Sequence, residues 1–378
     1  MGWRGRASAA VLALAVAGCT AGERSAPGAT AAPSTTAGSP VATSAGPSPS
    51  SSSTKVLSPR LAGVVARGLD VPWGLAFLPD GSALVSERDT ALVKRVTPAG
   101  RVSVVGRVSG VDGSGEGGLL GIALSPSYAR DHLLFAYFTA GAENRIARMT
   151  YDGSGLSGQR TIFGGIPSGV VHDGGRIAFG PDGFLYVGTG EAGRRSPAQD
   201  LHSLGGKILR ITAGGRPAPG NPFGDSPVYS YGHRNVQGLA WDAAGRLWAS
   251  EFGQDTWDEL NLVRPGGTYG WPAVEGRAGD PRYVDPVRQW PTDEASPSGV
   301  AVAGNAVYLA GLRGERLWQV PIPGGRPGTP RAWFTGDFGR LRTVALAPDG
   351  SLWLMTSNRD GRGSPRAGDD QIFRLTLS

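Results

Sequence analysis

The stretch Gly180-Pro-Asp-Gly-Phe-Leu-Tyr-Val187 decides the fold, because copies of it recur along the chain. Its Pro-Asp-Gly predicts a tight turn, and the alternating apolar residues that follow predict a β-strand. The clearest other copies are Leu78-Pro-Asp-Gly-Ser-Ala-Leu-Val85 and Ala347-Pro-Asp-Gly-Ser-Leu-Trp-Leu354. Weaker copies are Asp242-Ala-Ala-Gly-Arg-Leu-Trp-Ala249, Ala303-Gly-Asn-Ala-Val-Tyr-Leu309 and the divergent Leu124-Ser-Pro-Ser-Tyr128, which leads into residues 133–138.

The spacing of these copies predicts a β-propeller. The six copies begin near residues 78, 124, 179, 241, 302 and 346, which is a period of about 45 to 60 residues. A hairpin pair in each repeat gives four antiparallel strands, the content of one propeller blade. We therefore expect residues 58–378 to form an all-β, six-bladed β-propeller with four-stranded antiparallel blades. A β-sandwich would not account for a recurring period.

The composition agrees with a turn-dense β-protein. The chain has 378 residues, of which 61 are Gly and 29 are Pro, and long helical patterns of Leu, Ala, Glu and Lys are missing. The formal net charge is +6, but the basic residues are scattered rather than gathered in a stripe. We therefore expect no nucleic-acid partner.

The N-terminus predicts export and lipid attachment. Arg4 and Arg6 precede an apolar segment, residues 9–17, that is too short to span a membrane. The following Val16-Ala17-Gly18-Cys19 is similar to a bacterial lipobox. Residues 1–18 are therefore expected to be a signal peptide that is cleaved before a lipidated Cys19.

Residues 19–57 are expected to form a disordered tether between the lipid and the propeller. They consist mainly of Ser, Thr, Ala, Pro and Gly, and they lack the large apolar side chains that could offset the entropy of ordering. Cys19 is the only cysteine of the chain, so its acylation would leave no thiol for a disulfide or a thiolate metal site. The predicted location is extracytoplasmic, with a lipid anchor in the bacterial cell membrane.

Three Gly-rich segments contain the candidate chemistry: His172-Asp-Gly-Gly-Arg176, Gly190-Glu-Ala-Gly193 and Gly232-His-Arg-Asn-Val-Gln-Gly238. Glycine lets a backbone approach a ligand closely. Histidine supplies a proton acceptor, and arginine supplies a fixed positive charge. This combination suits oxidation of a polar substrate against an anionic cofactor.

Seven segments within residues 60–378 resemble the soluble glucose/sorbosone dehydrogenase family. They are Val71-Pro-Trp-Gly-Leu-Ala-Phe-Leu-Pro-Asp-Gly81, Gly115-Glu-Gly-Gly-Leu-Leu-Gly-Ile-Ala-Leu124, His172-Asp-Gly-Gly-Arg176, Gly205-Gly-Lys-Ile-Leu-Arg210, Tyr231-Gly-His-Arg-Asn-Val-Gln-Gly-Leu239, Asp258-Glu-Leu-Asn-Leu262 and Tyr269-Gly-Trp-Pro272.

The resemblance implies an activity and cofactors as well as a fold. Characterised members are six-bladed propellers that oxidise the anomeric carbon of an aldose to give a lactone. They use pyrroloquinoline quinone (PQQ), which receives the hydride, and calcium. The resemblance therefore implies a small-molecule sugar substrate and an electron acceptor that the sequence does not identify.

The resemblance also implies roles for four residues at the reacting centre. His172 matches the catalytic histidine, whose imidazole can take the hydroxyl proton of the sugar. Glu191 stands where the family usually has an Asp that orients this histidine. Arg234 and Asn235 match an Arg-Asn pair at the quinone, where Arg234 would stabilise developing oxyanion charge.

Four further residues are implied at the cofactor. Arg340 and Arg342 match two arginines that hold cofactor carboxylates, and strand alternation would place both on one face. Arg313 stands where the best-known members have Lys, which keeps the charge but changes the geometry. Glu116 stands where members often have Gln. A carboxylate there would meet an anionic cofactor unless it is protonated or paired with a cation.

The calcium ligands are less well matched. Gly253-Gln254 replaces a Gly-Pro whose backbone carbonyls bind the calcium that bridges to the quinone. Carbonyl ligation depends on backbone shape, so calcium binding is still expected, although loss of the proline predicts a less restrained loop. Asp258 and Glu259 could ligate a second, structural calcium, but acidic pairs on surfaces commonly have no such role.

Two other classes of function stay open on the sequence. One is a non-catalytic, extracytoplasmic binding module that has lost the quinone, which the departures at Glu116 and Gln254 suggest. The other is a calcium-dependent lactone hydrolase. That activity needs several inward carboxylates around one ion, whereas the motifs here supply mainly Arg and His.

Overall fold

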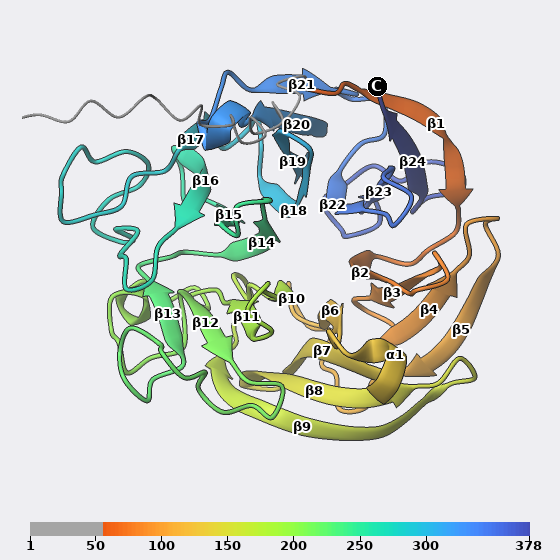
Figure 1. The fold of residues 1–378 in the computed structure, drawn as a ribbon, viewed down its shortest axis with the longest axis horizontal. Helices are drawn as coiled ribbons and strands as arrows, with labels where there is room; N and C mark the ends of the chain where they lie inside the picture. The colour runs from red at the N-terminus through yellow and green to blue at the C-terminus, as the bar shows by residue number, and fades with distance from the viewer. Residues whose placement is uncertain (1–55) are drawn as a thin grey trace, which may run out of the picture. The chain divides into compact units, whose positions relative to one another are not determined.

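The computed structural model describes residues 56–378, and this part of the chain is an all-β, six-bladed propeller. The expected signal peptide, Cys19 and nearly all of the expected tether lie outside the described residues. Six antiparallel sheets of four strands each are arranged in a ring (Figure 1). The described residues contain little helix. It consists of α1 (Tyr128–Asp131) and the 3-10 turns η1 (Ser196–Ala198) and η2 (Pro323–Gly325).

Five blades are each formed by four strands that are consecutive in the chain. The first is β2 (Pro72–Phe77), β3 (Ala83–Glu87), β4 (Leu92–Val96) and β5 (Val102–Arg107). The second is β6 (Leu119–Leu124), β7 (Leu133–Ala140), β8 (Glu143–Tyr151) and β9 (Leu156–Pro167). The third is β10 (Ile177–Phe179), β11 (Leu185–Gly188), β12 (Lys207–Ile211) and β13 (Val228–Tyr231).

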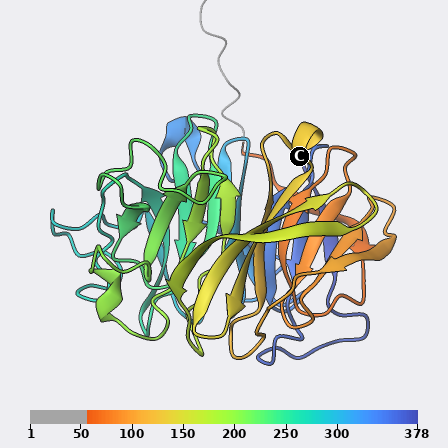
Figure 2. The same ribbon diagram turned by 90° about the horizontal axis from the view of Figure 1, so that it is seen from below.

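The fourth blade is β14 (Val236–Trp241), β15 (Leu247–Glu251), β16 (Trp257–Val263) and β17 (Arg288–Pro291). The fifth is β18 (Pro297–Ala303), β19 (Ala306–Gly311), β20 (Arg316–Pro321) and β21 (Arg331–Trp333). The long strand β9, yellow-green in Figure 2, runs along the outside of the ring.

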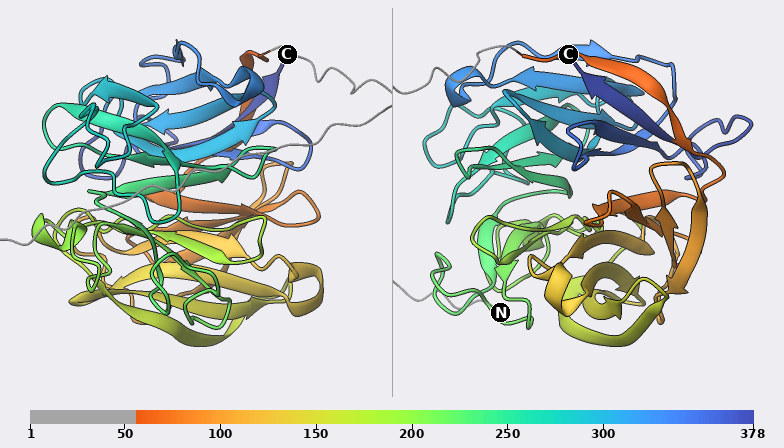
Figure 3. Two further views of the ribbon diagram at one scale, coloured as in Figure 1. Left: turned by 60° about the vertical axis from the view of Figure 1, so that its left-hand side comes forward. Right: turned by 45° about the vertical axis from the view of Figure 1, so that its right-hand side comes forward.

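The sixth blade closes the ring by joining the two ends of the described chain. It is formed by β22 (Leu341–Leu346), β23 (Leu352–Thr356), β24 (Ile372–Leu377) and the early strand β1 (Pro59–Ala66). β1, orange in Figure 3, pairs antiparallel with the dark blue β24, from Pro59 opposite Leu377 to Ala66 opposite Ile372. This pairing removes the free edge that β24 would otherwise expose.

The six predicted repeat turns all connect the first strand of a blade to the second. In the Pro-Asp-Gly copies, the Asp carboxylate accepts a hydrogen bond from the backbone amide two residues later. Asp80 accepts from Ser82, and Asp349 accepts from Ser351, both at 2.9 Å. The glycine after each Asp has a positive φ, +80° at Gly81, which favours glycine. The Asp and Gly of the repeat therefore form the turn that the sequence predicts.

The core consists of apolar layers between neighbouring blades. Each of the six blade-to-blade interfaces has its own cluster of buried side chains. The first strands of the blades contact one another in succession, and β2 also contacts β22, so the innermost strands close a circle. Trp248 is completely buried in one of these layers, between the fourth and fifth blades. Burying a large apolar side chain contributes about 2–3 kcal/mol, so these layers stabilise the ring.

Candidate active site

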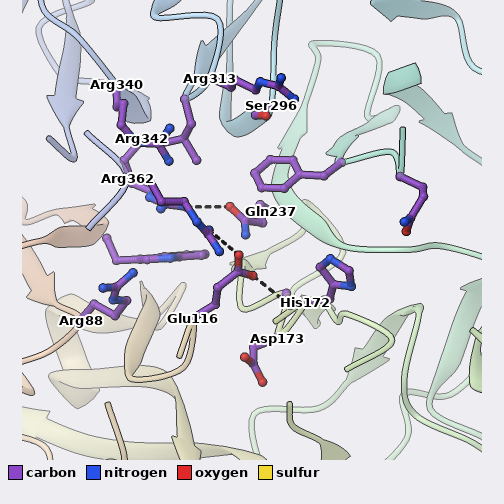
Figure 4. A pocket seen from close by; sticks show the side chains of 15 residues that line it. Arg88, Glu116, His172, Asp173, Gln237, Ser296, Arg313, Arg340, Arg342 and Arg362 are labelled. Atoms are coloured by element: carbon purple, nitrogen blue, oxygen red, sulfur yellow. Dashed lines mark hydrogen bonds and ion pairs between the residues drawn. The ribbon is translucent and has the colours of Figure 1, made fainter. Parts of the chain in front are cut away.

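A cavity of about 540 Å³ lies at the end of the propeller opposite the repeat turns. All six blades contribute to it. Most of its residues lie in the loops before the first strands or after the second strands, and a few lie in the first strands themselves. Figure 4 shows its side chains. The lining residues are Trp73, Arg88, Glu116, His172, Asp173, Gly174, Gln237, Phe252, Gln254, Ser296, Leu312, Arg313, Arg340, Arg342 and Arg362.

His172 lies at the edge of this cavity in a tightly held turn. Its φ is +63°, which is unusual for a residue other than glycine. Its backbone amide donates to Oε2 of Glu116 at 2.9 Å, and its carbonyl accepts from the amide of Ala192 at 3.1 Å. A side chain at Gly190 would meet the His172 carbonyl oxygen, since a Cβ there would lie only 1.7 Å away. The Gly-rich sequence is therefore required for this close approach.

Glu191 orients the His172 ring. The Nδ1 atom of His172 lies 2.5 Å from Oε1 of Glu191, whose side chain is only 2% exposed. The extra methylene of Glu, relative to Asp, does not prevent this contact. Because Nδ1 is held by the carboxylate, Nε2 is the ring nitrogen left to meet a ligand, and it has no hydrogen-bond partner among residues 56–378. A ring fixed in this way suits a general base.

The three Gly-rich segments meet beside the cavity. The amide of Glu191 donates to the Arg234 carbonyl at 2.9 Å, and Gly190 forms a β-bridge with Asn235. The Asn235 side-chain oxygen accepts from the amide of Gly174 at 2.9 Å. Its Nδ2 is buried without a partner among the described residues. Asn235 thus fixes the turn after His172 and retains one unused donor.

Arg234 is close to this cluster but does not line the large cavity. Its guanidinium donates to Oε1 of Gln254, at 2.9 Å from Nη2, and lies 5.4 Å from the ring centre of Trp271. It instead borders a small neighbouring pocket. Burial lowers the pKa of Arg234, although Glu191 and other carboxylates oppose this shift. The residue that replaces the family's proline therefore holds the arginine expected at the quinone.

Arg340 and Arg342 lie together in the cavity, as strand alternation predicts. Arg342 is in β22, and Arg340 directly precedes it. Both contact Asp360, with Nη2 of Arg340 at 2.9 Å and Nη2 of Arg342 at 3.6 Å from Oδ2. Burial, helped by Arg340 and Arg88, lowers the pKa of Arg342 to about 10 despite the nearby Asp360. The Arg342 guanidinium is thus charged near neutral pH.

Glu116 is paired with a cation. Arg362 reaches across from the loop after β23, and its Nη1 lies 2.5 Å from Oε1 of Glu116 (Figure 4). Burial would raise the pKa of Glu116, but the amide of His172 and the guanidinium of Arg362 outweigh it and lower the pKa. Glu116 is therefore an ionised carboxylate whose charge Arg362 neutralises.

The loop at Gly253 and Gln254 is restrained, contrary to the expected loosening. Oε1 of Glu275 accepts hydrogen bonds from four consecutive amides, those of residues 254–257, at 2.6 to 3.0 Å. Burial opposes ionisation of Glu275, but these four bonds outweigh it and lower its pKa. The Gly253 amide is held by Oδ1 of Asp258 at 2.9 Å. Neither the Gly253 nor the Gln254 carbonyl accepts a hydrogen bond from residues 56–378.

Asp258 and Glu259 do not form a surface pair. Both are buried in β16, and their carboxylates bind different groups. Asp258 binds the amides of Gly253 and Ser296, whereas Glu259 binds the amide of Gly276. Burial raises the pKa of Asp258 to about 7. Residues 56–378 contain no group of three or more His, Cys, Asp or Glu side chains that could hold a metal ion.

Some residues of the cavity escape the sequence reasoning. Arg362 lines the cavity, and Asp360 binds two of its arginines; both belong to a Gly- and Arg-rich loop, residues 357–368, with no period and no motif. Arg88 follows β3, and Gln237 accepts from Nη1 of Arg342 at 2.8 Å. The excess of arginine in the loop after β23 is the one sequence signal that could have indicated Asp360 and Arg362.

The donor set of the cavity fits an anionic ligand with several oxygens. Arg313, Arg340 and Arg342 lie on one side of it (Figure 4). Within the described residues, Nε of Arg342 is buried without a hydrogen-bond partner, and Arg313 has no ion-pair partner. A guanidinium presents its donors in a fork that matches carboxylate oxygens. These groups can therefore bind the carboxylates of an anionic ligand.

Comparison with known proteins shows the family to which the chain belongs. The family model described as glucose/sorbosone dehydrogenase matches residues 69–365. The chain belongs to the glucose/sorbosone dehydrogenase family. The chain is also 29% identical over 338 residues to aldose sugar dehydrogenase YliI of Escherichia coli, across 79% of this chain and 91% of that protein. It is 32% identical over 258 residues to quinoprotein glucose dehydrogenase B of Acinetobacter calcoaceticus, across 58% and 54% respectively.

A solved structure of this glucose/sorbosone dehydrogenase family is similar over the whole propeller. The PQQ-bound form of aldose sugar dehydrogenase from Streptomyces coelicolor is 59% identical, with a TM-score of 0.83. The match covers 85% of this chain and 99% of that chain. The fold and the family predicted from the sequence are thus confirmed. Among the described residues, no helix has the length and apolar character needed to cross a membrane.

Proposed function

We propose that this member of the glucose/sorbosone dehydrogenase family is a PQQ-dependent aldose dehydrogenase that oxidises a sugar at its anomeric carbon to a lactone. The observation that carries the proposal is the position of the His172–Glu191 pair at the edge of a cavity whose other side presents Arg313, Arg340 and Arg342. A base thus faces a site for an anionic cofactor. The similarity to the PQQ-bound Streptomyces coelicolor enzyme supports the same cofactor.

The residues present fit PQQ and calcium. Arg313, Arg340 and Arg342 would hold the carboxylates of PQQ. The carbonyls of Gly253 and Gln254, which accept no hydrogen bond from residues 56–378, would supply calcium ligands. When bound, PQQ would supply the acceptor for the hydride, that is, for one proton together with two electrons.

The role of the chain is to position the sugar and to take its proton. Nε2 of His172 accepts the proton of the anomeric hydroxyl, and Glu191 stabilises the imidazolium that results. The Arg234 carbonyl accepts from the Glu191 amide, and the Arg234 guanidinium, which Gln254 holds, would supply positive charge beside the site. Asn235 keeps the turn after His172 in place through Gly174.

Reconstitution tests the proposal. The purified protein is loaded with PQQ and calcium, and dye reduction is measured with several aldoses. We expect sugar-dependent reduction that falls by about 10²–10⁴-fold in His172→Gln, while quinone uptake is retained. Quinone binding without oxidation of any aldose would contradict the proposed dehydrogenase activity. Activity that survives in His172→Gln would show that His172 is not the base.

Within this proposal the protein works outside the cytoplasm. We infer that Cys19 is lipidated and that residues 20–57 tether the propeller to the membrane, because the N-terminal sequence is similar to a bacterial lipobox. Two acyl chains give stable attachment. Such a tether would leave the cavity free to meet diffusing sugars and an electron acceptor.

A further inference from the structure

Glu116 and Arg362 form an ion pair between distant parts of the chain, next to the His172 backbone. Oε1 of Glu116 contacts Nη1 of Arg362 at 2.5 Å, and Oε2 of the same carboxylate accepts from the His172 amide at 2.9 Å. The Arg362 side chain is 56% exposed, whereas that of Glu116 is 17% exposed. The pair therefore lies at the open part of the cavity, beside the base.

The other charges of the cavity are arranged differently. Arg340 and Arg342 are paired with Asp360, and Arg88 is paired with Asp89. Arg313 has no ion-pair partner among residues 56–378. Figure 4 shows Arg313, Arg340 and Arg342 on one side of the cavity and His172 on the other. The Arg362–Glu116 pair lies between these two sides.

The cavity thus has a cationic part and a part in which charge is compensated. The cationic part suits an anionic cofactor. Asp173, which lies next to His172, is buried, and its Oδ1 accepts hydrogen bonds from Nδ2 of Asn144 at 3.0 Å and from the amide of Gly169 at 3.1 Å. On the side of the base, Glu116 and Arg362 both line the cavity and are paired with each other. A sugar that brings its anomeric hydroxyl to His172 must lie close to this pair.

We propose that the Glu116–Arg362 pair determines substrate charge: it keeps the sugar-binding side of the cavity neutral, so that uncharged aldoses are selected over sugar acids. This inference rests on the proposed function. The carboxylate accepts hydrogen bonds from sugar hydroxyls, and the guanidinium donates to them. Because the two charges cancel, the pair offers no net charge to which a charged substrate could bind.

The proposal also connects two features that seem unrelated in the sequence. Glu116 stands where the family often has a neutral Gln, and Arg362 belongs to a loop without a recognisable motif. In this chain the neutral Gln is thus replaced by two side chains, Glu116 and Arg362, whose charges cancel. Loss of one partner would leave a single charge within a few ångströms of the sugar, where an unscreened charge changes affinity by about tenfold.

Three variants test the pair with two sugars that differ by one charge. D-Glucuronate and D-glucuronamide share the anomeric centre and differ only in the carboxylate and its neutral amide. Glu116→Gln leaves Arg362 unpaired and keeps an oxygen that can accept from the His172 amide. Arg362→Gln leaves Glu116 unpaired. The double variant removes both charges, and thermal unfolding shows whether each protein is folded.

The measured quantity is the ratio of kcat/KM for glucuronate to that for glucuronamide, with PQQ and calcium bound. We expect this ratio to rise about tenfold in Glu116→Gln and to fall about tenfold in Arg362→Gln. In the double variant it should return close to the wild-type value. An equal ratio in all four proteins would overturn the proposal, and so would single variants that shift it in the same direction.

Calorimetric binding of glucuronate to the quinone-free proteins gives a second readout that needs no turnover. The dissociation constant should decrease in Glu116→Gln and increase in Arg362→Gln. If no sugar is oxidised by any quinone-loaded protein, the proposed function fails, and these constants still decide the role of the pair. Unchanged constants would contradict it.

Discussion

Nδ1 of His172 lies 2.5 Å from Oε1 of Glu191, and this contact joins the turn before β10 to the turn after β11. Glu191 is almost completely buried, and its amide is held by the Arg234 carbonyl. Its position does not depend on solvent or on a mobile side chain. The contact makes Glu191 the partner that sets the orientation of the His172 ring.

Replacement of this carboxylate should slow turnover. In Glu191→Gln a side-chain oxygen can still accept from Nδ1, but the negative charge that stabilises the imidazolium is lost. We expect kcat of the reconstituted enzyme to fall by about 10²-fold, measured by dye reduction at saturating sugar. Quinone uptake by the variant serves as the control for folding. Wild-type kcat in Glu191→Gln would show that the contact only supports the turn.

Asp360 should stabilise the quinone-free protein by compensating two buried arginines. Asp360→Asn leaves Arg340 and Arg342 without their carboxylate, so the free energy of unfolding should fall by about 3 kcal/mol. Added PQQ should raise Tm more in this variant than in the wild type, because its carboxylates would replace the lost charge. Asp337→Asn, at an exposed site, is the matched control. Equal PQQ-induced shifts in Asp360→Asn and the wild type would mean that PQQ does not bind these arginines.

Glu275 should make the loop at Gln254 sensitive to acid. Its pKa is lower in the folded protein than in the unfolded chain, so the unfolded state binds more protons as the pH falls. The stabilisation is therefore complete above the ordinary Glu pKa and is lost as the pH falls through the folded value. Glu275→Gln should lack this component of the acid dependence in denaturant titrations. The prediction fails if wild type and variant lose stability in parallel below pH 5.

Much of the fold could be predicted from the sequence because its signals are local. A Pro-Asp-Gly turn is stabilised by bonds between residues of the turn itself, such as the hydrogen bond from the Ser82 amide to the Asp80 carboxylate. Even the divergent copy at Leu124 marks the turn between the first two strands of its blade. Closure of the ring by β1 and β24 could not be predicted, since it pairs residues about 300 positions apart and no turn connects them.

The candidate site was predictable only in part. The position of His172 beside Glu191 follows from Gly-rich segments that the family resemblance makes recognisable. The salt bridge from Arg362 to Glu116 and the four bonds to Glu275 depend on contacts between loops, for which the chain has no periodic signal. The buried positions of Asp258 and Glu259 were missed because an acidic pair suggests an exposed surface.

The lipid anchor makes a prediction that is independent of the cavity. Wild-type protein should partition with membranes, whereas Cys19→Ser should be released or remain unprocessed, because the thiol is the acceptor of the lipid. Fractionation followed by immunoblotting measures this. Limited proteolysis should remove residues 20–57 and leave the propeller intact. A fully soluble wild-type protein with an unmodified Cys19 would contradict the anchor.

The most direct test of the central claim is an absorbance titration of the purified protein with PQQ in the presence of calcium. The account predicts saturable uptake of one PQQ per chain at micromolar concentration or below, because several arginines converge on the cavity. Arg342→Met should weaken this uptake by at least about tenfold. Absence of PQQ uptake by the folded protein would contradict the assignment as a quinoprotein and favour a binding module.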